Sequence, residues 1–128
     1  METYRSQREA MLRVLNALVP SVDRSRLLRS AEELNDAKRK DEYESRLDIL
    51  ETLIRDVWML TLGAKQESLV NEDLRSQLTT LSRDIDSSRT AAWISKIEDL
   101  REQFAVNINR KVATDALFLS MAGADLGT

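Results

Sequence analysis

Hydrophobic residues recur along the chain every three or four positions, which is the spacing of a helix that buries one face. The clearest example lies between Asp41 and Gly63, where the apolar positions are Tyr43, Leu47, Leu50, Ile54 and Val57. Runs of Val, Ile and Thr that alternate with polar residues, as strands require, do not occur. The pattern therefore predicts an all-α fold.

Six helices are expected, because the one proline and three glycines leave long uninterrupted tracts of good helix formers. Their expected ranges are about 3–19, 24–35, 41–62, 72–85, 87–106 and 110–122. We expect a single compact bundle of five to six helices over residues 1–128, with residues 123–128 as a frayed tail.

Polar residues and glycines mark the predicted helix ends. Ser21 or Asp23, Asn71, and Asp86 or Ser87 are N-cap candidates, and Gly63 is a natural residue for a left-handed C-terminal cap. The third helix is apolar nearly all round in its last part, so we expect it to be central. In the second and sixth helices the residues expected to face inward are Leu27, Leu28, Ala31, Leu34, Val112, Ala113, Ala116, Leu117 and Met121.

Composition argues against catalysis. The 128 residues include no Cys and no His, which removes thiolate chemistry, the usual general base and the commonest metal ligand. A P-loop motif is also missing. Paired carboxylates such as Glu98 and Asp99 fall on predicted polar faces, where solvated acids are the expected interpretation. We expect no enzyme activity, no cofactor and no metal site.

Charge and hydropathy say little in favour of nucleic acid or lipid as a partner. The net charge is −3, and both halves of the chain are slightly acidic. The basic clusters at Arg24, Arg26 and Arg29 and at residues 38–40 have acids close by, which favours an ion-paired surface. The longest apolar run, Val57–Leu60, is too short to span a membrane, and we expect a cytoplasmic protein.

Two polar features do not fit a simple amphipathic pattern. Arg55 and Asp56 interrupt the most apolar helix, and Asn107 and Asn109 flank Ile108 between the last two helices. Asn both caps helices and tolerates the left-handed conformation, so this spacing is typical of a tight break. We hypothesise that Arg55 or Asp56 hydrogen-bonds the backbone of residues 105–110.

Three segments together resemble a known family: LDILETLIRDVWMLTLGAKQE, NEDLRSQLTTLSRDI and EDLREQFAVNINRKVATDALFLSMA. They are similar to the C-terminal domain of the bacterial DNA polymerase III delta prime subunit, and the related gamma/tau subunit is the second choice. The matching features are Arg55, Asp56, the turn at 107–109, and Ala113, Leu117 and Leu119 after it. The likeness extends from about residue 1 to residue 122.

The resemblance implies a helical collar domain, of the kind that holds five clamp-loader subunits in a ring. The expected partners are the delta and gamma/tau subunits, with the sliding clamp and primed DNA reached only through AAA+ modules that this chain does not contain. The third helix and the run at 117–119 carry more apolar residues than packing against one core requires. The extra residues suggest a partner interface at Trp58, Met59, Phe118 and Leu119, and the alternative is that these four are buried in the core. The alternative functions are a helical adaptor or dimerisation protein unrelated to replication, then a nucleic-acid-binding domain, and last an enzyme.

Overall fold

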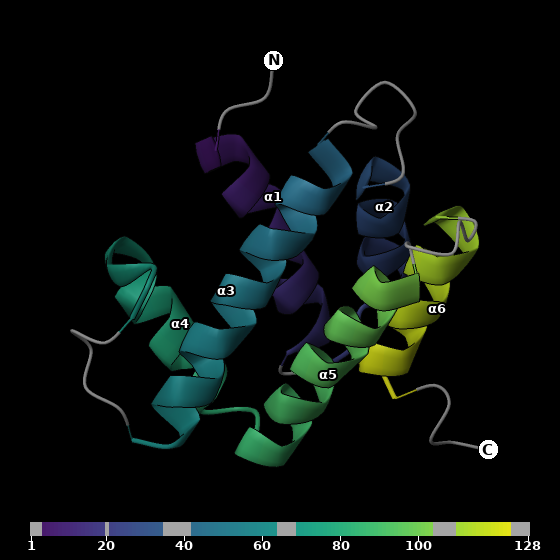
Figure 1. The fold of residues 1–128 in the computed structure, drawn as a ribbon. Coiled ribbons are helices and arrows are strands. Elements are labelled where there is room, and N and C mark those ends of the chain that lie inside the picture. Colours follow the sequence, from purple (N-terminus) through teal and green to yellow (C-terminus); the bar gives the residue numbers. More distant parts are fainter. Residues whose placement is uncertain (1–3, 20, 35–41, 64–68, 104–109, 124–128) are drawn as a thin grey trace.

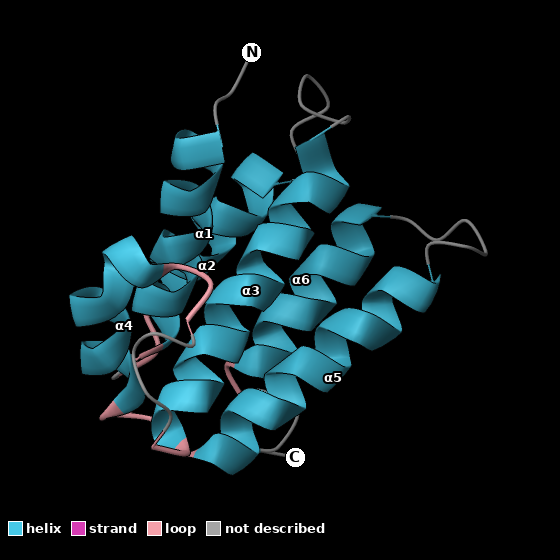
Figure 2. Ribbon diagram, turned by 60° about the vertical axis from the view of Figure 1, so that its left-hand side comes forward, coloured by secondary structure: helices cyan, strands magenta, loops and turns pink. Residues whose placement is uncertain are grey.

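The chain folds into helices in every part that the computed structural model describes, namely residues 4–19, 21–34, 42–63, 69–103 and 110–123 (Figures 1 and 2). The elements are α1 (Tyr4–Leu18), α2 (Arg24–Leu34), α3 (Tyr43–Thr61), the 3-10 turn η3 (Glu72–Leu74), α4 (Arg75–Ser82), α5 (Ser87–Gln103) and α6 (Arg110–Met121). The predicted all-α bundle of six α-helices is confirmed.

Five of the helices close into a ring. Helix α1 packs against α2, α2 against α6, α6 against α5, α5 against α3, and α3 against α1. Helix α4 packs against α3 at the edge of this ring (Figure 1). Because α3 contacts α1, α4 and α5, it is the central helix that its apolar sequence predicted.

The core fills the space between these helices and follows the predicted stripes of α1 and α3. Its most deeply buried side chains include Met11, Leu15, Leu18, Leu27, Leu34, Leu47, Leu50, Leu53, Ile54 and Phe118. A hydroxyl contact between Tyr43 and Thr114 joins the start of α3 to α6 inside this core. Buried polar groups need such partners, so this contact also fixes how α6 sits on the bundle.

The predicted helix ends are mostly confirmed. Asp23 and Asp86 each accept a hydrogen bond from the backbone N–H three residues later, at 3.1 Å and 2.8 Å, as N-caps do. Gly63 follows α3 with φ +82°, and its N–H donates to the carbonyl of Leu60 at 3.0 Å. Gly123 ends α6 in the same way, with φ +83°.

Three residues predicted to face inward lie on the surface. Leu28 is 46% exposed, Val112 is 65% exposed, and Ala116 is also exposed. Helix α2 meets its two neighbours with Leu27, Ala31 and Leu34, and a residue adjacent in sequence lies about 100° away around the helix. The apolar arcs of α2 and α6 are therefore wider than the faces that the bundle buries.

Candidate functional site

The solvent-facing stripe of α3 changes from charged to apolar along the helix. Its first part carries Glu44, Asp48 and Arg55, all exposed. Continuing at helical spacing, the same stripe reaches Met59, which is partly exposed, and Leu62, which is 58% exposed. Trp58, beside them and also partly exposed, completes what we call the α3-end surface: Trp58, Met59 and Leu62.

A buried carboxylate in α3 holds the segment that leads into α4. Asp56 is 2% exposed and accepts hydrogen bonds from the backbone N–H of Val70 at 2.9 Å and of Asn71 at 2.8 Å. The side-chain amide of Asn71 donates to the same carboxylate at 2.9 Å. Three donors satisfy this buried acid, so its role is to join α3 to the start of η3.

Asn71 does not act as the N-cap that its position predicted. Its side chain makes no capping hydrogen bond to the turn that follows, because the amide points back to Asp56 and its oxygen faces Arg8 at 3.4 Å. Arg8 also forms a two-pronged ion pair with Asp73. Asn71 therefore connects α1, α3 and η3 through one buried amide.

The ion pair between Arg8 and Asp73 shifts the pKa of both residues. The hydrogen bonds that Arg8 donates hold the pKa of Asp73 below its ordinary value of 3.8, and the same bonds to the Asp73 carboxylate raise the pKa of Arg8. Both groups stay charged at neutral pH. The pair is at the surface on the Asp73 side, so we assign it to docking η3 on α1 and not to chemistry.

A second charged cluster ties α3 to α5. Glu51 accepts from Arg55 at 3.0 Å and from Arg101 at 3.1 Å, Arg55 reaches Glu98 at 3.2 Å, and Arg101 also pairs with Asp48. Partial burial disfavours the charge on Arg101, but the hydrogen bonds with Asp48 and Glu51 outweigh that effect and raise its pKa. The cluster sets the register of two packed helices.

The hypothesis that Arg55 or Asp56 hydrogen-bonds the backbone of residues 105–110 stays a prediction, because residues 104–109 fall outside the described part of the chain. The described partners of Arg55 lie on α3 and α5, and those of Asp56 at residues 70 and 71. Asn107 and Asn109 fall outside the described residues. Asp56 is buried and paired, and residues 70 and 71 belong to the segment that it holds.

Helix α6 has an apolar stripe on its outer side. Val112, Ala116 and Leu119 are spaced by four and three residues and are all exposed or partly exposed, and we call them the α6 outer stripe. Phe118, the remaining interface candidate, is only 1% exposed, so packing in the core accounts for it. Of the two alternatives stated for Phe118, a partner interface or the core, its burial favours the core.

The start of α5 fixes the end of α6. The indole N–H of Trp93 donates to the carbonyl of Met121 at 3.0 Å, and the Arg89 guanidinium reaches the same oxygen at 3.5 Å while lying 5.2 Å from the centre of the Trp93 ring. A positive charge at a helix C-terminus is favourable. Trp93 is buried, as the sequence predicted, and the α6 outer stripe is held on a rigid support.

Within the described residues, no group of acidic side chains is arranged to hold a metal ion. Nor does any helix in those ranges combine the length and hydropathy that crossing a bilayer would require. The described surface does offer exposed apolar side chains: single ones at Tyr4, Leu28 and Val70, and groups at the α3-end surface and the α6 outer stripe. Such a surface suits contact with other proteins.

The fold and these surfaces thus define a helical protein-contact domain. Comparison with known families identifies it further: residues 4–121 match the family described as DNA polymerase III, delta subunit, C terminal. The chain belongs to this family, which places it among the C-terminal domains of clamp-loader subunits. No curated protein and no solved structure gives a significant match.

Proposed function

We propose that this chain is the collar domain of a clamp-loader subunit of the delta prime type, and that it acts in subunit assembly without catalysis of its own. The family match over residues 4–121 supports the clamp-loader part of this proposal. The delta prime part is supported by the sequence resemblance at Arg55, Asp56 and residues 107–109. The proposed setting is the cytoplasm, with delta and gamma/tau as partners.

The observation that carries the proposal is the presence of two outward apolar surfaces on different helices. A subunit inside a ring touches two neighbours, so it requires two contact surfaces. The α3-end surface and the α6 outer stripe meet this requirement, and the first includes Trp58 and Met59, whose residue types are enriched at interfaces. Both helices are held by the bundle, so the surfaces are formed before a partner arrives.

Three matched substitutions test the assignment: Leu62→Glu, Val112→Glu and Leu28→Glu. Each replaces an exposed apolar residue on a helix or at its end, with side chains 58%, 65% and 46% exposed. Mixing with the delta and gamma/tau subunits of the same organism, followed by light scattering, measures the complex. We expect L62E and V112E each to weaken it, because a charge is then buried in a contact, and L28E to leave it intact.

Helicity measured by circular dichroism has to remain unchanged in all three variants. A weaker complex then reports the loss of a subunit contact and not unfolding of the chain. If the unmodified chain forms no complex with either subunit, the assembly function is wrong. If L28E weakens the complex as much as L62E and V112E, the two surfaces are wrong.

A competition experiment separates delta prime from delta. A delta prime domain occupies its own place in the ring, so it should join a complex of gamma/tau that already contains delta. A delta domain would instead compete with full-length delta for the same place. Displacement of delta by the chain in size-exclusion chromatography would reject the delta prime assignment and keep the clamp-loader one.

A further inference from the structure

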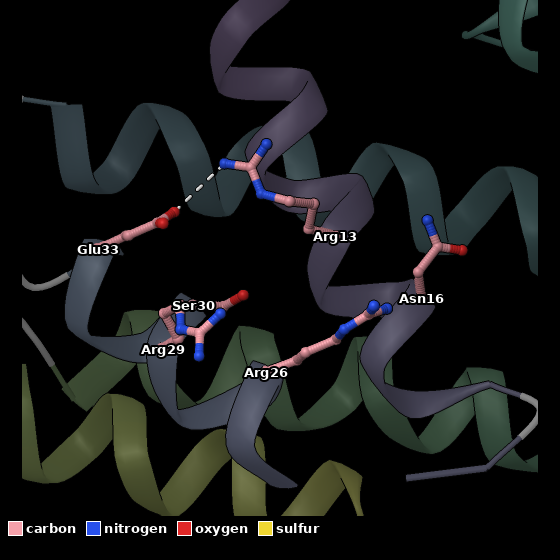
Figure 3. Close-up of a pocket in the computed structure, with 6 residues that line it drawn as sticks. All are labelled: Arg13, Asn16, Arg26, Arg29, Ser30 and Glu33. Carbon is pink, nitrogen blue, oxygen red and sulfur yellow. Dashed lines mark hydrogen bonds and ion pairs between the residues drawn. The ribbon is translucent and has the colours of Figure 1, made fainter. Parts of the chain in front are cut away.

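A pocket of about 350 Å³ opens between α1 and α2 (Figure 3). Helix α1 contributes the first two of its lining residues and α2 the other four: Arg13, Asn16, Arg26, Arg29, Ser30 and Glu33. Three cations and one anion in this set make the lining positive, although the whole chain is negative. This local reversal of charge is the feature that calls for an explanation.

The positive charges around the pocket are only partly neutralised. Arg13 pairs with Glu33 at 3.3 Å, and the Nε of Arg26 lies 3.5 Å from Asp23. Arg29 forms no ion pair with any residue that the structure describes. Figure 3 shows Arg13 and Arg26 extending from the two helices on either side of the open space, so their donors border it from both sides.

The frame of the pocket is fixed before any ligand binds. Arg46, a buried residue of α3, donates to the backbone carbonyl of Glu33 at 3.2 Å and so anchors the last turn of α2. Ser30 is also buried, at the face where α2 meets the bundle. A preformed site loses less conformational entropy on binding than one that must be assembled.

We propose that this pocket binds the carboxylate side chains of an acidic peptide segment in a partner protein. Guanidinium groups bind planar carboxylates through two parallel hydrogen bonds, and three of them here surround a volume that fits a few side chains. The Asn16 amide and the Ser30 hydroxyl supply further hydrogen-bonding groups of the kind that orient a peptide.

The distribution of charge favours a peptide over nucleic acid. A nucleic-acid strand carries regularly spaced phosphates and is attracted by an extended basic surface. Here Asp23 lies beside Arg26 and Glu33 beside Arg13, so neighbouring phosphates would meet carboxylates next to the pocket. The side chains of a peptide are flexible, so one carboxylate can reach Arg29 while the others turn away from Asp23 and Glu33.

This site uses α1 and α2, whereas the proposed assembly surfaces lie on α3 and α6, so the inference does not depend on the clamp-loader assignment. The probe is a synthetic peptide of six glutamates with blocked ends, titrated into the ¹⁵N-labelled 128-residue chain at low salt. Hexaglutamine serves as the uncharged control. We expect saturable shifts at the amides of Arg13–Asn16 and Arg26–Glu33 and at the arginine Nε–H signals.

Two double variants separate the pocket from general attraction. Arg26→Glu with Arg29→Glu reverses two charges in the pocket, and Arg75→Glu with Arg83→Glu reverses two exposed charges at the ends of α4. Both change the net charge equally. We expect the first pair to weaken hexaglutamate binding by about tenfold or more and the second to change it by about twofold or less. Arg29→Gln, which is milder, should also weaken binding if the first pair unfolds the chain.

Several results would overturn the inference. One is the absence of saturable shifts, or an equal loss of binding in the two double variants. Another is inorganic phosphate binding at the same signals as tightly as hexaglutamate, which would define a small-anion site only. Tighter binding of a single-stranded oligonucleotide of equal charge at these residues would assign the pocket to nucleic acid instead.

Discussion

Replacing Asp56 with Ala should destabilise the bundle, because this carboxylate is the buried acceptor that holds the segment before α4. It accepts from the backbone N–H groups of Val70 and Asn71 and from the Asn71 amide, at 2.8–2.9 Å. Asn71 is 1% exposed, so water does not readily replace the lost acceptor. The substitution leaves two buried donors of Asn71 without their partner.

The expected loss follows from those two groups. A buried polar group deprived of its hydrogen bond costs about 1–3 kcal/mol. The Asn71 amide keeps its 3.5 Å approach to the Thr52 hydroxyl, and Val70 is exposed enough for its N–H to reach water, which limits the total. We therefore expect the free energy of unfolding to fall by about 2–4 kcal/mol, out of the roughly 5–15 kcal/mol that a domain of this size has.

Urea unfolding followed by circular dichroism measures this loss. With a slope of about 2 kcal/mol per M, the midpoint should fall by about 1–2 M. Asp99→Ala is the matched control, since Asp99 is an exposed acid on α5, and its midpoint should stay within about 0.3 M of the unmodified chain. If D56A and D99A shift the midpoint equally, the Asp56 carboxylate does not stabilise the contact between α3 and the segment at residues 70 and 71.

Three further predictions concern the core, a helix end and the surface ion pair. Leu50→Ala should lower the free energy of unfolding by about 2–5 kcal/mol and Leu28→Ala by less than about 0.5 kcal/mol, since the first is fully buried and the second is not; equal urea midpoints would contradict this. Gly63→Ala should cost about 1 kcal/mol in the same assay through its φ of +82° alone, because no atom lies within 4 Å of the added Cβ; an unchanged midpoint would show that this backbone strain is absent. Arg8→Ala should raise the pKa of Asp73 toward 3.8 in a carboxyl NMR titration. Because the folded-state pKa of Asp73 is depressed, the ion pair stabilises the fold above about pH 4, and this stabilisation is lost as the pH falls through that pKa. A difference in free energy of unfolding between R8A and the unmodified chain that persists at low pH would contradict this.

The fold was predictable from sequence where the apolar period and the helix ends agree. Helix α3 shows this best: its stripe, its central position and its end at Gly63 all follow from residue types at helical spacing. Where the apolar arc of a helix is wide, the sequence did not show which of its apolar residues face the core and which face solvent. Val112 and Leu28 are apolar and correctly spaced, yet only the arrangement of neighbouring helices decides which part of each arc is buried.

The contact between Asp56 and Asn71 was predictable only in part. A charged residue in an apolar helix lies either at an edge or buried and paired, and the structure gives Asp56 the second arrangement. Its partner could not be derived, because Asn71 is 15 residues away and carries the local pattern of an N-cap. Local and tertiary hydrogen bonds compete for the same amide, and at this position the tertiary bond to Asp56 prevails. The α1–α2 pocket was equally hidden, since its arginines come from two helices.

The order in which the ring closes has a consequence for synthesis of the chain. Helix α2 packs against α1 and α6, so its stripe of Leu27, Ala31 and Leu34 is fully covered only once α6 has been synthesised. A nascent chain that ends before Arg110 holds five helices and an open apolar seam between α2 and α5. Such intermediates attract chaperones and aggregate, and a stop codon ahead of α6 would therefore yield a protein that is degraded instead of a smaller working domain.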